Sequence, residues 1–241
     1  MYSMINWFTA RLPIEYRTPG RFWIMMMGHN SFLRIWHKVG IGRQREQVPS
    51  NADPKLKALI DAWPCCRTGY YTVDIAGVQL PGGRSWSERW GAIESATDYD
   101  NKTILELGCN QAILSTSLMK FCNAKQTIAV DIDKRALRTG NILADYYGVS
   151  PTFIRVDFDA QTAWEDMLTA YQPDIVTAMS VLNWVKDKDR FVAFLSRFDQ
   201  LLYEGHRSVE VETDYLLKSG FAKVDIVESK PGRRAVLLAT K

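Results

Sequence analysis

From residue 102 onward, short apolar runs alternate with segments of helical spacing. The spacing predicts strands at 103–107, 126–132, 152–158, 173–182 and 200–204, and helices at 112–122, 134–148, 162–171, 190–198 and 209–220. Two further strands, 222–229 and 234–240, flank the hairpin-like sequence KPGR. Strand–helix alternation is typical of a parallel sheet with helices on both faces. We therefore expect a doubly wound, seven-stranded α/β sheet whose last strand is antiparallel.

The residues before this pattern are less regular and more basic. Residues 1–50 hold seven arginine or lysine residues and two glutamates, whereas the whole chain has a net charge of +3. We expect a helical cap that exposes its arginines; the alternative is a peripheral membrane or protein contact through residues 1–50. A helix is expected at 54–62 and a hairpin or extended strand at 70–85. The predicted organisation is a cap and lead-in hairpin over 1–84 and the main α/β domain over 85–241.

Composition excludes several classes of protein. The small net charge gives no reason to require a nucleic-acid partner. Four cysteines, with no CxxC pair and no histidine at ligand spacing, argue against a zinc site or a disulfide framework. We find no signal peptide and no apolar window of ~20 residues that would span a membrane. The expected location is cytoplasmic, with a membrane-peripheral position as the alternative.

The loop after the first regular strand indicates a ligand site. Gly108 is the single glycine where dinucleotide-binding loops carry three, and Asn110 and Ala112 occupy the other two positions. A strand–loop–helix still presents backbone N–H groups at a helix N-terminus, which suits a ligand without a pyrophosphate. Asp131 ends the second strand, where a carboxylate can accept both hydroxyls of a ribose. Asp157 and Phe158 end the third strand and offer an acceptor for an amine and an aromatic face.

Together these residues resemble class I S-adenosylmethionine-dependent methyltransferases over roughly residues 85–241, and the Gly-Cys-Asn loop looks like a known variant of their first motif. The resemblance implies a Rossmann-like methyltransferase fold and S-adenosylmethionine as cofactor. It implies that Glu106 and Gly108 line the methionine end and that Arg89, or less favourably Arg84, holds the methionine carboxylate. The other cofactor-binding residues expected on this basis are Asn110, Asp131 for the ribose, Ile132, Asp157 and Phe158 around the adenine, and Ser180.

The sequence identifies the methyl acceptor less clearly than the cofactor. The fourth strand runs into SVLNW, which lacks the Asn/Asp-Pro-Pro-aromatic signature of many base N-methyltransferases. Asn183 and Trp184 are candidate acceptor contacts. His206 is a candidate general base, with Glu204 to orient it, because its ordinary pKa of ~6.5 suits proton transfer at neutral pH. A catalytic base is not obligatory, since in-line placement against a sulfonium supplies much of the rate.

The resemblance, together with the basic and aromatic N-terminal segment, favours O-methylation of a saccharide end on a surface glycan, or of another small polar metabolite. One alternative is an RNA (tRNA) methyltransferase that uses the basic segment against phosphates. Another is a catalytically degenerate binding protein of the same fold. A dinucleotide-dependent dehydrogenase is the weakest option because the phosphate loop is incomplete. No metal is expected at the site.

Overall fold

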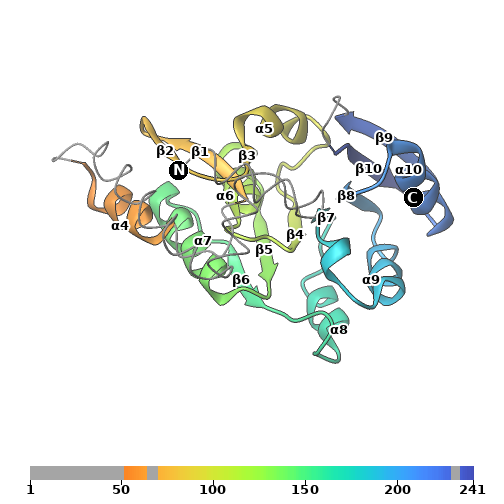
Figure 1. The fold of residues 1–241 in the computed structure, drawn as a ribbon. Helices are drawn as coiled ribbons and strands as arrows, with labels where there is room; N and C mark the ends of the chain where they lie inside the picture. Colours follow the sequence, from red (N-terminus) through yellow and green to blue (C-terminus); the bar gives the residue numbers. More distant parts are fainter. Residues whose placement is uncertain (1–51, 64–69, 229–233) are drawn as a thin grey trace, which may run out of the picture. The chain divides into compact units, whose positions relative to one another are not determined.

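A computed structural model describes residues 52–63, 70–228 and 234–241, which all belong to the compact unit Asn51–Lys241 (Figure 1). The expectations for the basic segment 1–50 and for the KPGR turn lie outside the described residues. The described segments before residue 85, 52–63 and 70–84, belong to the same compact unit as the sheet. The boundary expected at residues 84 and 85 stays a prediction.

A seven-stranded sheet in the order β6-β5-β4-β7-β8-β10-β9 forms the centre of this unit. The strands are β4 (Thr103–Leu107), β5 (Gln126–Asp131), β6 (Thr152–Arg155), β7 (Ile175–Met179), β8 (Gln200–Glu204), β9 (Lys223–Glu228) and β10 (Val236–Thr240). Pairing is parallel from β6 to β8, and β10 is antiparallel to both β8 and β9. The predicted doubly wound sheet with an antiparallel last strand is confirmed.

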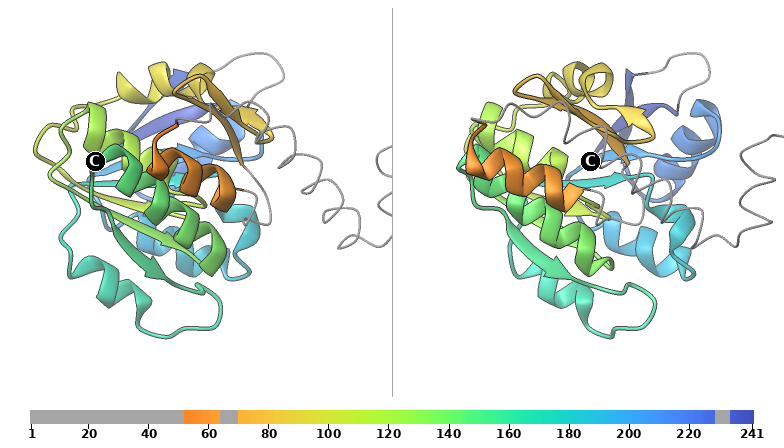
Figure 2. Two further views of the ribbon diagram at one scale, coloured as in Figure 1. Left: turned by 90° about the vertical axis from the view of Figure 1, so that its left-hand side faces the viewer. Right: turned by 60° about the vertical axis from the view of Figure 1, so that its left-hand side comes forward.

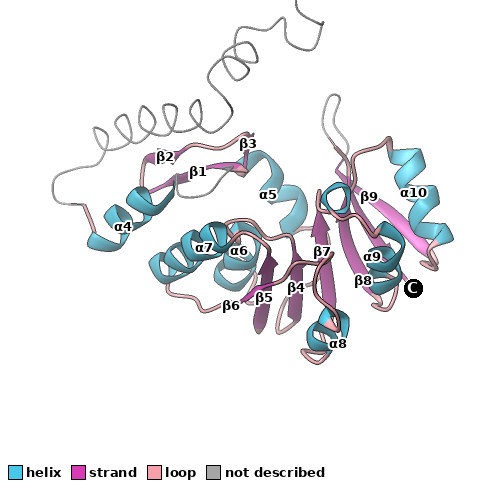
Figure 3. Ribbon diagram, turned by 60° about the horizontal axis from the view of Figure 1, so that its bottom comes forward, coloured by secondary structure: helices cyan, strands magenta, loops and turns pink. Residues whose placement is uncertain are grey.

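Helices cover both faces of the sheet, as Figure 3 shows. The face that carries Glu106 meets α5 (Ser87–Glu94), α6 (Ile113–Phe121) and α7 (Lys134–Tyr147), while the other face meets α8 (Trp164–Thr169), α9 (Lys188–Leu195) and α10 (Val209–Lys218). Gly148 caps the C-terminus of α7 and takes the left-handed conformation (φ +70°) that glycine adopts without strain.

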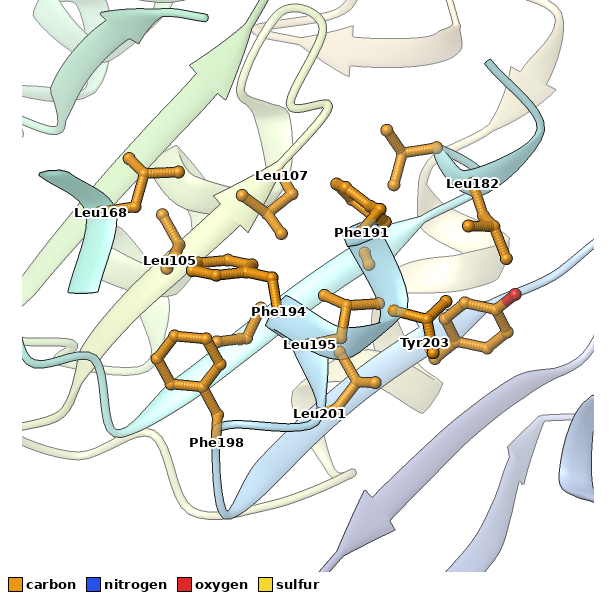
Figure 4. Packing of buried hydrophobic residues seen from close by; sticks show 14 of the residues in the cluster. Leu105, Leu107, Leu168, Leu182, Phe191, Phe194, Leu195, Phe198, Leu201 and Tyr203 are labelled. Atoms are coloured by element: carbon orange, nitrogen blue, oxygen red, sulfur yellow. The ribbon is translucent and has the colours of Figure 1, made fainter. Parts of the chain in front are cut away.

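The largest apolar core lies between the sheet and helices α8 to α10. Alternate residues of β4, Leu105 and Leu107, belong to it. Figure 4 shows side chains of α9, including Phe191 and Phe194, gathered over the strands. All five residues of β4 are buried, as expected for a parallel strand that is covered on both faces, and Glu106 is its one charged residue.

A second, three-stranded sheet packs against the main domain in the order β2-β1-β3. It consists of β1 (Tyr71–Ile75), β2 (Val78–Leu80) and β3 (Arg84–Ser85), which confirms the hairpin expected at 70–85. The chain crosses close to β1 at Gly82, where a Cβ atom would lie 2.0 Å from the carbonyl carbon of Tyr71. Only glycine fits there, and the crossing sets the position of Arg84.

Helix α4 (Pro54–Ala62) coincides with the helix expected at 54–62 and packs beside α7 in both views of Figure 2. Lys55 Nζ donates to the carbonyl of Asp145 at 2.9 Å, and Thr139 Oγ1 donates to the carbonyl of Ala62 at 3.1 Å. The indole of Trp63 then donates to the carbonyl of Pro81 at 2.9 Å. These contacts connect the lead-in segment to both the small sheet and α7.

Two strands, β6 and β7, end three residues before the expected position. Strand β6 ends at Arg155, so Asp157 and Phe158 lie in the following loop rather than in the strand. Strand β7 ends at Met179, and the next residues turn into η3 (Leu182–Trp184). In both places apolar residues continue beyond the ladder because the loop itself enters the core, which a hydrophobic pattern does not distinguish from a strand.

Candidate functional site

The strand order reverses between β4 and β7. The chain runs from β4 outward through β5 and β6, then crosses back to β7 and β8 on the other side of β4. In open α/β sheets, ligands bind beyond the carboxyl ends of the strands at such a switch point. The loop 108–112 after β4 and the loop 180–184 after β7 flank this position.

The loop after β4 holds a left-handed backbone at three alternate residues. The φ angles are +71° at Gly108, +50° at Asn110 and +50° at Ala112. These are the positions at which a three-glycine loop has its glycines, so the two substitutions leave the left-handed conformations in place. Asparagine tolerates this conformation, whereas alanine accepts it at a cost of roughly 1–2 kcal/mol. A Cβ atom at Gly108 would lie 2.7 Å from Cγ2 of Val181, which brings the two loops into direct contact.

Asp131 ties this loop to the end of β5. Its Oδ2 accepts a hydrogen bond from the backbone N–H of Asn110 at 2.7 Å, and its Oδ1 accepts one from the backbone N–H of Asp133 at 2.8 Å. Burial raises the pKa of Asp131 above its ordinary value, and the two backbone donors oppose that shift. A carboxylate has about four lone-pair sites, so both oxygens retain capacity for a diol. The neighbouring Ile132 is 51% exposed and presents an apolar surface beside it.

Several polar atoms in the same loop are buried without a hydrogen-bond partner among the described residues. They are Oδ1 of Asn110 and both amide atoms of Gln111. Buried polar groups are rarely left unpaired, since each costs about 1–3 kcal/mol. Helix α7 closes over the loop here, because a Cβ at Gly140 would lie 2.8 Å from the carbonyl oxygen of Gln111. A polar ligand at the loop would supply the missing partners.

Glu106 is a buried carboxylate at the start of this loop. Its Oε2 accepts from the backbone N–H of Ser115 at 3.0 Å and from the Ser115 hydroxyl at 2.5 Å. Burial raises the pKa of Glu106 to about 7, and the Ser115 bonds limit the shift. Its ionisation is therefore close to balance near neutral pH. Burial also raises the pKa of the Cys109 thiol well above its usual range, which disfavours the nucleophilic thiolate form at neutral pH.

A second polar group forms at the carboxyl ends of β7 and β8, around the fully buried Glu204. Glu204 Oε1 accepts from Arg84 Nη1 at 2.8 Å and lies within hydrogen-bonding distance of the Ser180 hydroxyl, while Glu204 Oε2 lies 2.8 Å from Arg89 Nη2. We call this group the arginine cluster; its members are Tyr70, Arg84, Arg89, Ser180, Glu204, Glu228 and Arg234.

Arg89 and Ser180, both expected at the cofactor, are engaged inside this cluster. The Arg89 guanidinium pairs with Glu204 and also with Oε2 of Glu228 at 3.1 Å, and its side chain is only 6% exposed. The Ser180 hydroxyl contacts Glu204 and accepts from Arg234 Nη1 at 2.8 Å. Both side chains were expected to contact the cofactor, whereas here they bind other residues of the protein. Arg84, the weaker candidate, keeps 31% of its side chain exposed.

His206 lies just after β8; among the described residues it has no hydrogen bond to Glu204, although the Glu204 charge acts on the imidazole and opposes the lowering of its pKa. Its backbone N–H donates to Oε1 of Glu212 at 3.0 Å, while the Glu204 carboxylate is occupied by arginines. Gly205 allows this approach, since a Cβ there would lie 2.1 Å from the Glu212 carboxyl. Burial and the charge of Arg234 lower the pKa of His206. The imidazole is therefore neutral at neutral pH, as a general base requires.

Phe158 and Asp157, the two residues expected around the adenine, have different surroundings: Phe158 is buried, and Asp157 is partly exposed. Phe158 is buried in the core, with ring centroids 4.9 Å from Trp164 and 5.1 Å from Phe191. Its ring is therefore packed in the aromatic cluster, and its expected contact with the adenine stays a prediction. Asp157 accepts from the backbone N–H groups of Asp159 at 3.0 Å and Ala160 at 3.1 Å, so it caps its own turn.

The candidate acceptor contacts are open to solvent. Trp184 is 82% exposed at the end of η3, and Asn183 beside it is also exposed. An indole so exposed is not explained by packing in this domain. Within the described ranges, no group of three or more histidine, cysteine or acidic residues is placed to hold a metal ion, and no helix is long and apolar enough to cross a membrane.

Sequence reasoning missed several members of the site. Tyr70 and Arg234 belong to the arginine cluster, yet they lie 134 and 30 positions from Glu204 in the chain. Such contacts leave no local pattern. The Gln111 amide had a usable signal, because a large polar side chain inside an otherwise buried loop needs a partner.

Comparison with known proteins gives the following matches. Residues 105–199 match the family described as a methyltransferase domain. The human protein-lysine N-methyltransferase EEF2KMT is 32% identical over 104 residues, which cover 38% of this chain and 31% of that protein. The chain thus matches about a third of that relative's length. The crystal structure of EvdMO1 superimposes with a TM-score of 0.62 at 12% identity, over 80% of this chain and 49% of that one. The N-terminal domain of EvdMO1 in the presence of SAH and D-fucose superimposes with a TM-score of 0.59 at 11% identity, over 80% of this chain and 99% of that domain.

Proposed function

Because the chain carries a class I S-adenosylmethionine-dependent methyltransferase domain, we propose that it transfers a methyl group to a hydroxyl of a saccharide or another small polar metabolite. One observation carries the cofactor half of the proposal. The loop after β4 keeps left-handed backbone at residues 108, 110 and 112 and is bonded through Asn110 to Asp131. This is a preformed cradle for a nucleoside without a pyrophosphate.

The residues of the cradle fit S-adenosylmethionine. Asp131 would accept the ribose hydroxyls, and the exposed side chain of Ile132 would pack on the adenine. Gly108 would allow close approach of the methionine end, with Glu106 beneath it. The unpaired polar atoms of Asn110 and Gln111 would find partners there. When bound, the cofactor supplies a methyl group on a sulfonium, and the sulfur is a good leaving group because it departs as a neutral thioether.

The charges beside the loop favour a hydroxyl acceptor over an amine. In the described part of the arginine cluster, three arginines face two glutamates, a balance of +1. A positive site opposes the approach of an ammonium group and stabilises the negative charge that develops on an attacking oxygen. The neutral imidazole of His206 could accept the hydroxyl proton. The exposed indole of Trp184 offers a flat apolar face to a sugar ring.

Protein-lysine N-methylation is the second candidate, and the 32% identity to EEF2KMT favours it. A lysine acceptor would have to lose its proton and enter beside the positively charged cluster. The local electrostatics therefore rank this candidate below a hydroxyl acceptor.

The first test is calorimetric titration with S-adenosylmethionine, with NAD as the decoy ligand. We expect micromolar binding of S-adenosylmethionine, no binding of NAD, and at least ~10-fold weaker cofactor binding by Asp131→Ala. The control Asp199→Ala removes an acidic side chain just before β8, at the amino end of that strand and therefore at the far end from the cofactor loop. It should bind S-adenosylmethionine as the wild type does. A folded protein that binds no S-adenosylmethionine would instead be the degenerate binding module.

The second test follows a labelled methyl group from S-adenosylmethionine into acceptors. A panel of saccharides is compared with a lysine-rich protein extract under the same conditions. Label recovered as a base-stable methyl ether supports the hydroxyl acceptor. Label recovered as methyl-lysine would replace it with the second candidate.

A further inference from the structure

Two arginines in the arginine cluster converge on one oxygen. Arg84 Nη1 lies 2.8 Å and Arg234 Nη1 lies 3.7 Å from Oε1 of Glu204. Each side chain is 31% exposed, whereas Glu204 is fully buried. The two guanidinium groups thus form the outer layer of the cluster, and the carboxylate forms its floor.

Most of the hydrogen-bonding capacity of these two arginines is unused within the described ranges. The hydrogen bonds and ion pairs of Arg84 and Arg234 all involve Nη1. The Arg84 guanidinium also lies over the ring of Tyr70, 5.2 Å from its centroid, which fixes the plane of the group. A guanidinium has five N–H donors in a rigid fork that matches carboxylate and phosphate oxygens. Each fork therefore retains donors for an external anion.

The charge balance favours such an anion. Arg89 shares Glu204 and is further neutralised by Glu228, which leaves the outer pair with one shared carboxylate. Two cations around one anion repel each other in a partly dry site, where the effective dielectric constant is well below that of water. A second anion between them would offset this repulsion.

The cluster also lies beside the proposed site of methyl transfer. Ser180, which accepts from Arg234, directly precedes Val181, and Val181 touches Gly108 of the cofactor loop. His206, the candidate base, is close enough to Arg234 and Arg84 for both charges to lower its pKa. The free donors, the base and the cofactor loop therefore share one edge of the sheet.

We propose that the methyl acceptor is an acidic saccharide whose carboxylate or phosphate is bound by Arg84 and Arg234 next to the reacting hydroxyl. This inference rests on the proposed function and specifies its substrate class. Arg84 and Arg234 are specificity-determining residues; they hold the charged group of the acceptor while the hydroxyl faces the cofactor.

The test compares three probes that differ in charge: D-glucuronate, D-glucose 6-phosphate and D-glucose. Each is titrated calorimetrically into the full chain saturated with S-adenosylhomocysteine. We expect the two acidic sugars to bind at least ~10-fold more tightly than glucose and to weaken as salt is raised. Binding of only one acidic sugar would identify the anion as carboxylate or phosphate and would still support the proposal.

Variants assign the effect to the two arginines. Arg84→Gln and Arg234→Gln should each reduce the preference for acidic sugars at least ~3-fold, and the double variant should abolish it. Arg84→Lys keeps the charge that neutralises Glu204 but removes the fork, so it provides a folded variant if the glutamine variants unfold. Arg197→Gln removes one positive charge from the exposed segment before β8, at the opposite edge, and should leave the preference unchanged.

Two results would overturn the inference. Equal binding of the three sugars, or undetectable binding of both acidic sugars, would show that the cluster does not recognise an anion of the acceptor. A large loss of S-adenosylmethionine affinity in Arg84→Gln and Arg234→Gln would assign the arginines to the methionine carboxylate instead. Failure of the wild-type chain to bind S-adenosylmethionine at all would contradict the proposed function, and it is read from a separate titration.

Discussion

Glu106 should make the protein lose stability as pH rises from 4.5 to about 7, and Glu106→Gln should remove this effect. Burial raises the pKa of this carboxyl from an ordinary value of 4.5 to about 7. A difference of about 2.5 units corresponds to roughly 3 kcal/mol, since each unit is worth about 1.4 kcal/mol. This is the approximate cost of carrying an ionised Glu106 in the folded chain above pH 7.

The sign follows from proton linkage. Between pH 4.5 and about 7 the folded chain binds a proton at Glu106 that the unfolded chain has lost, so the free energy of unfolding falls as pH rises. Glutamine does not titrate. The free energy of unfolding of Glu106→Gln, minus that of the wild type, should therefore rise by roughly 3 kcal/mol from pH 4.5 to pH 8.

Urea unfolding of both proteins at several pH values measures this difference. Any penalty for the extra N–H donor of glutamine is independent of pH and shifts the whole curve without changing its slope. Glu165→Gln is a suitable control, because the Arg190 guanidinium lowers the pKa of Glu165 and its titration lies below pH 4.5. Its difference from the wild type should be constant from pH 5 to 8. A constant difference for Glu106→Gln, within ~1 kcal/mol, would refute the reasoning.

Three further outcomes follow from the site. Gly108→Ala should destabilise the fold by roughly 2–4 kcal/mol through the left-handed backbone and the clash with Val181, and Val181→Ala should restore part of that loss; an unchanged melting temperature would contradict the clash. Arg89→Met should cost about 3–5 kcal/mol in urea unfolding, because it leaves the buried Glu204 without one of its partners. His206→Ala should lower turnover by ~10²-fold if the imidazole accepts the proton, whereas a change of only a few-fold leaves a structural role. The acid limb of the wild-type pH–rate profile should lie below the ordinary histidine pKa, because burial and the charge of Arg234 lower the pKa of His206.

Much of the fold was predictable because short strands rich in apolar residues alternate regularly with segments of helical spacing. The bounds of β4 and β8 agree with expectation, since each run follows a charged residue and is followed by a glycine. The extension of the third strand to residue 158 was wrong. Val156 and Phe158 are apolar because their loop lies against the core, and burial alone does not reveal whether a residue is paired in a ladder.

The site was predictable where it depends on positions at strand ends and less so where it depends on conformation or distant contacts. Asp131 follows directly from its place after β5. The left-handed angles at Asn110 and Ala112 could not be predicted, because non-glycine residues adopt them only when the surrounding structure compensates the strain. The pairing of Arg89 with Glu204 and Glu228 joins residues more than 100 positions apart, so each charge suggested a separate role when taken alone.

The place of β10 has a consequence for the order in which the chain can be assembled during synthesis. This strand, Val236–Thr240, lies inside the sheet between β8 and β9. Until those residues emerge from the ribosome, the nascent chain exposes one unpaired edge of β8, and β9 has no neighbour in the sheet. Such an edge is a template for pairing with other chains. A chain interrupted shortly before residue 236 would therefore be prone to aggregate and would be a natural client for chaperones, although most of its apolar core would already have been synthesised.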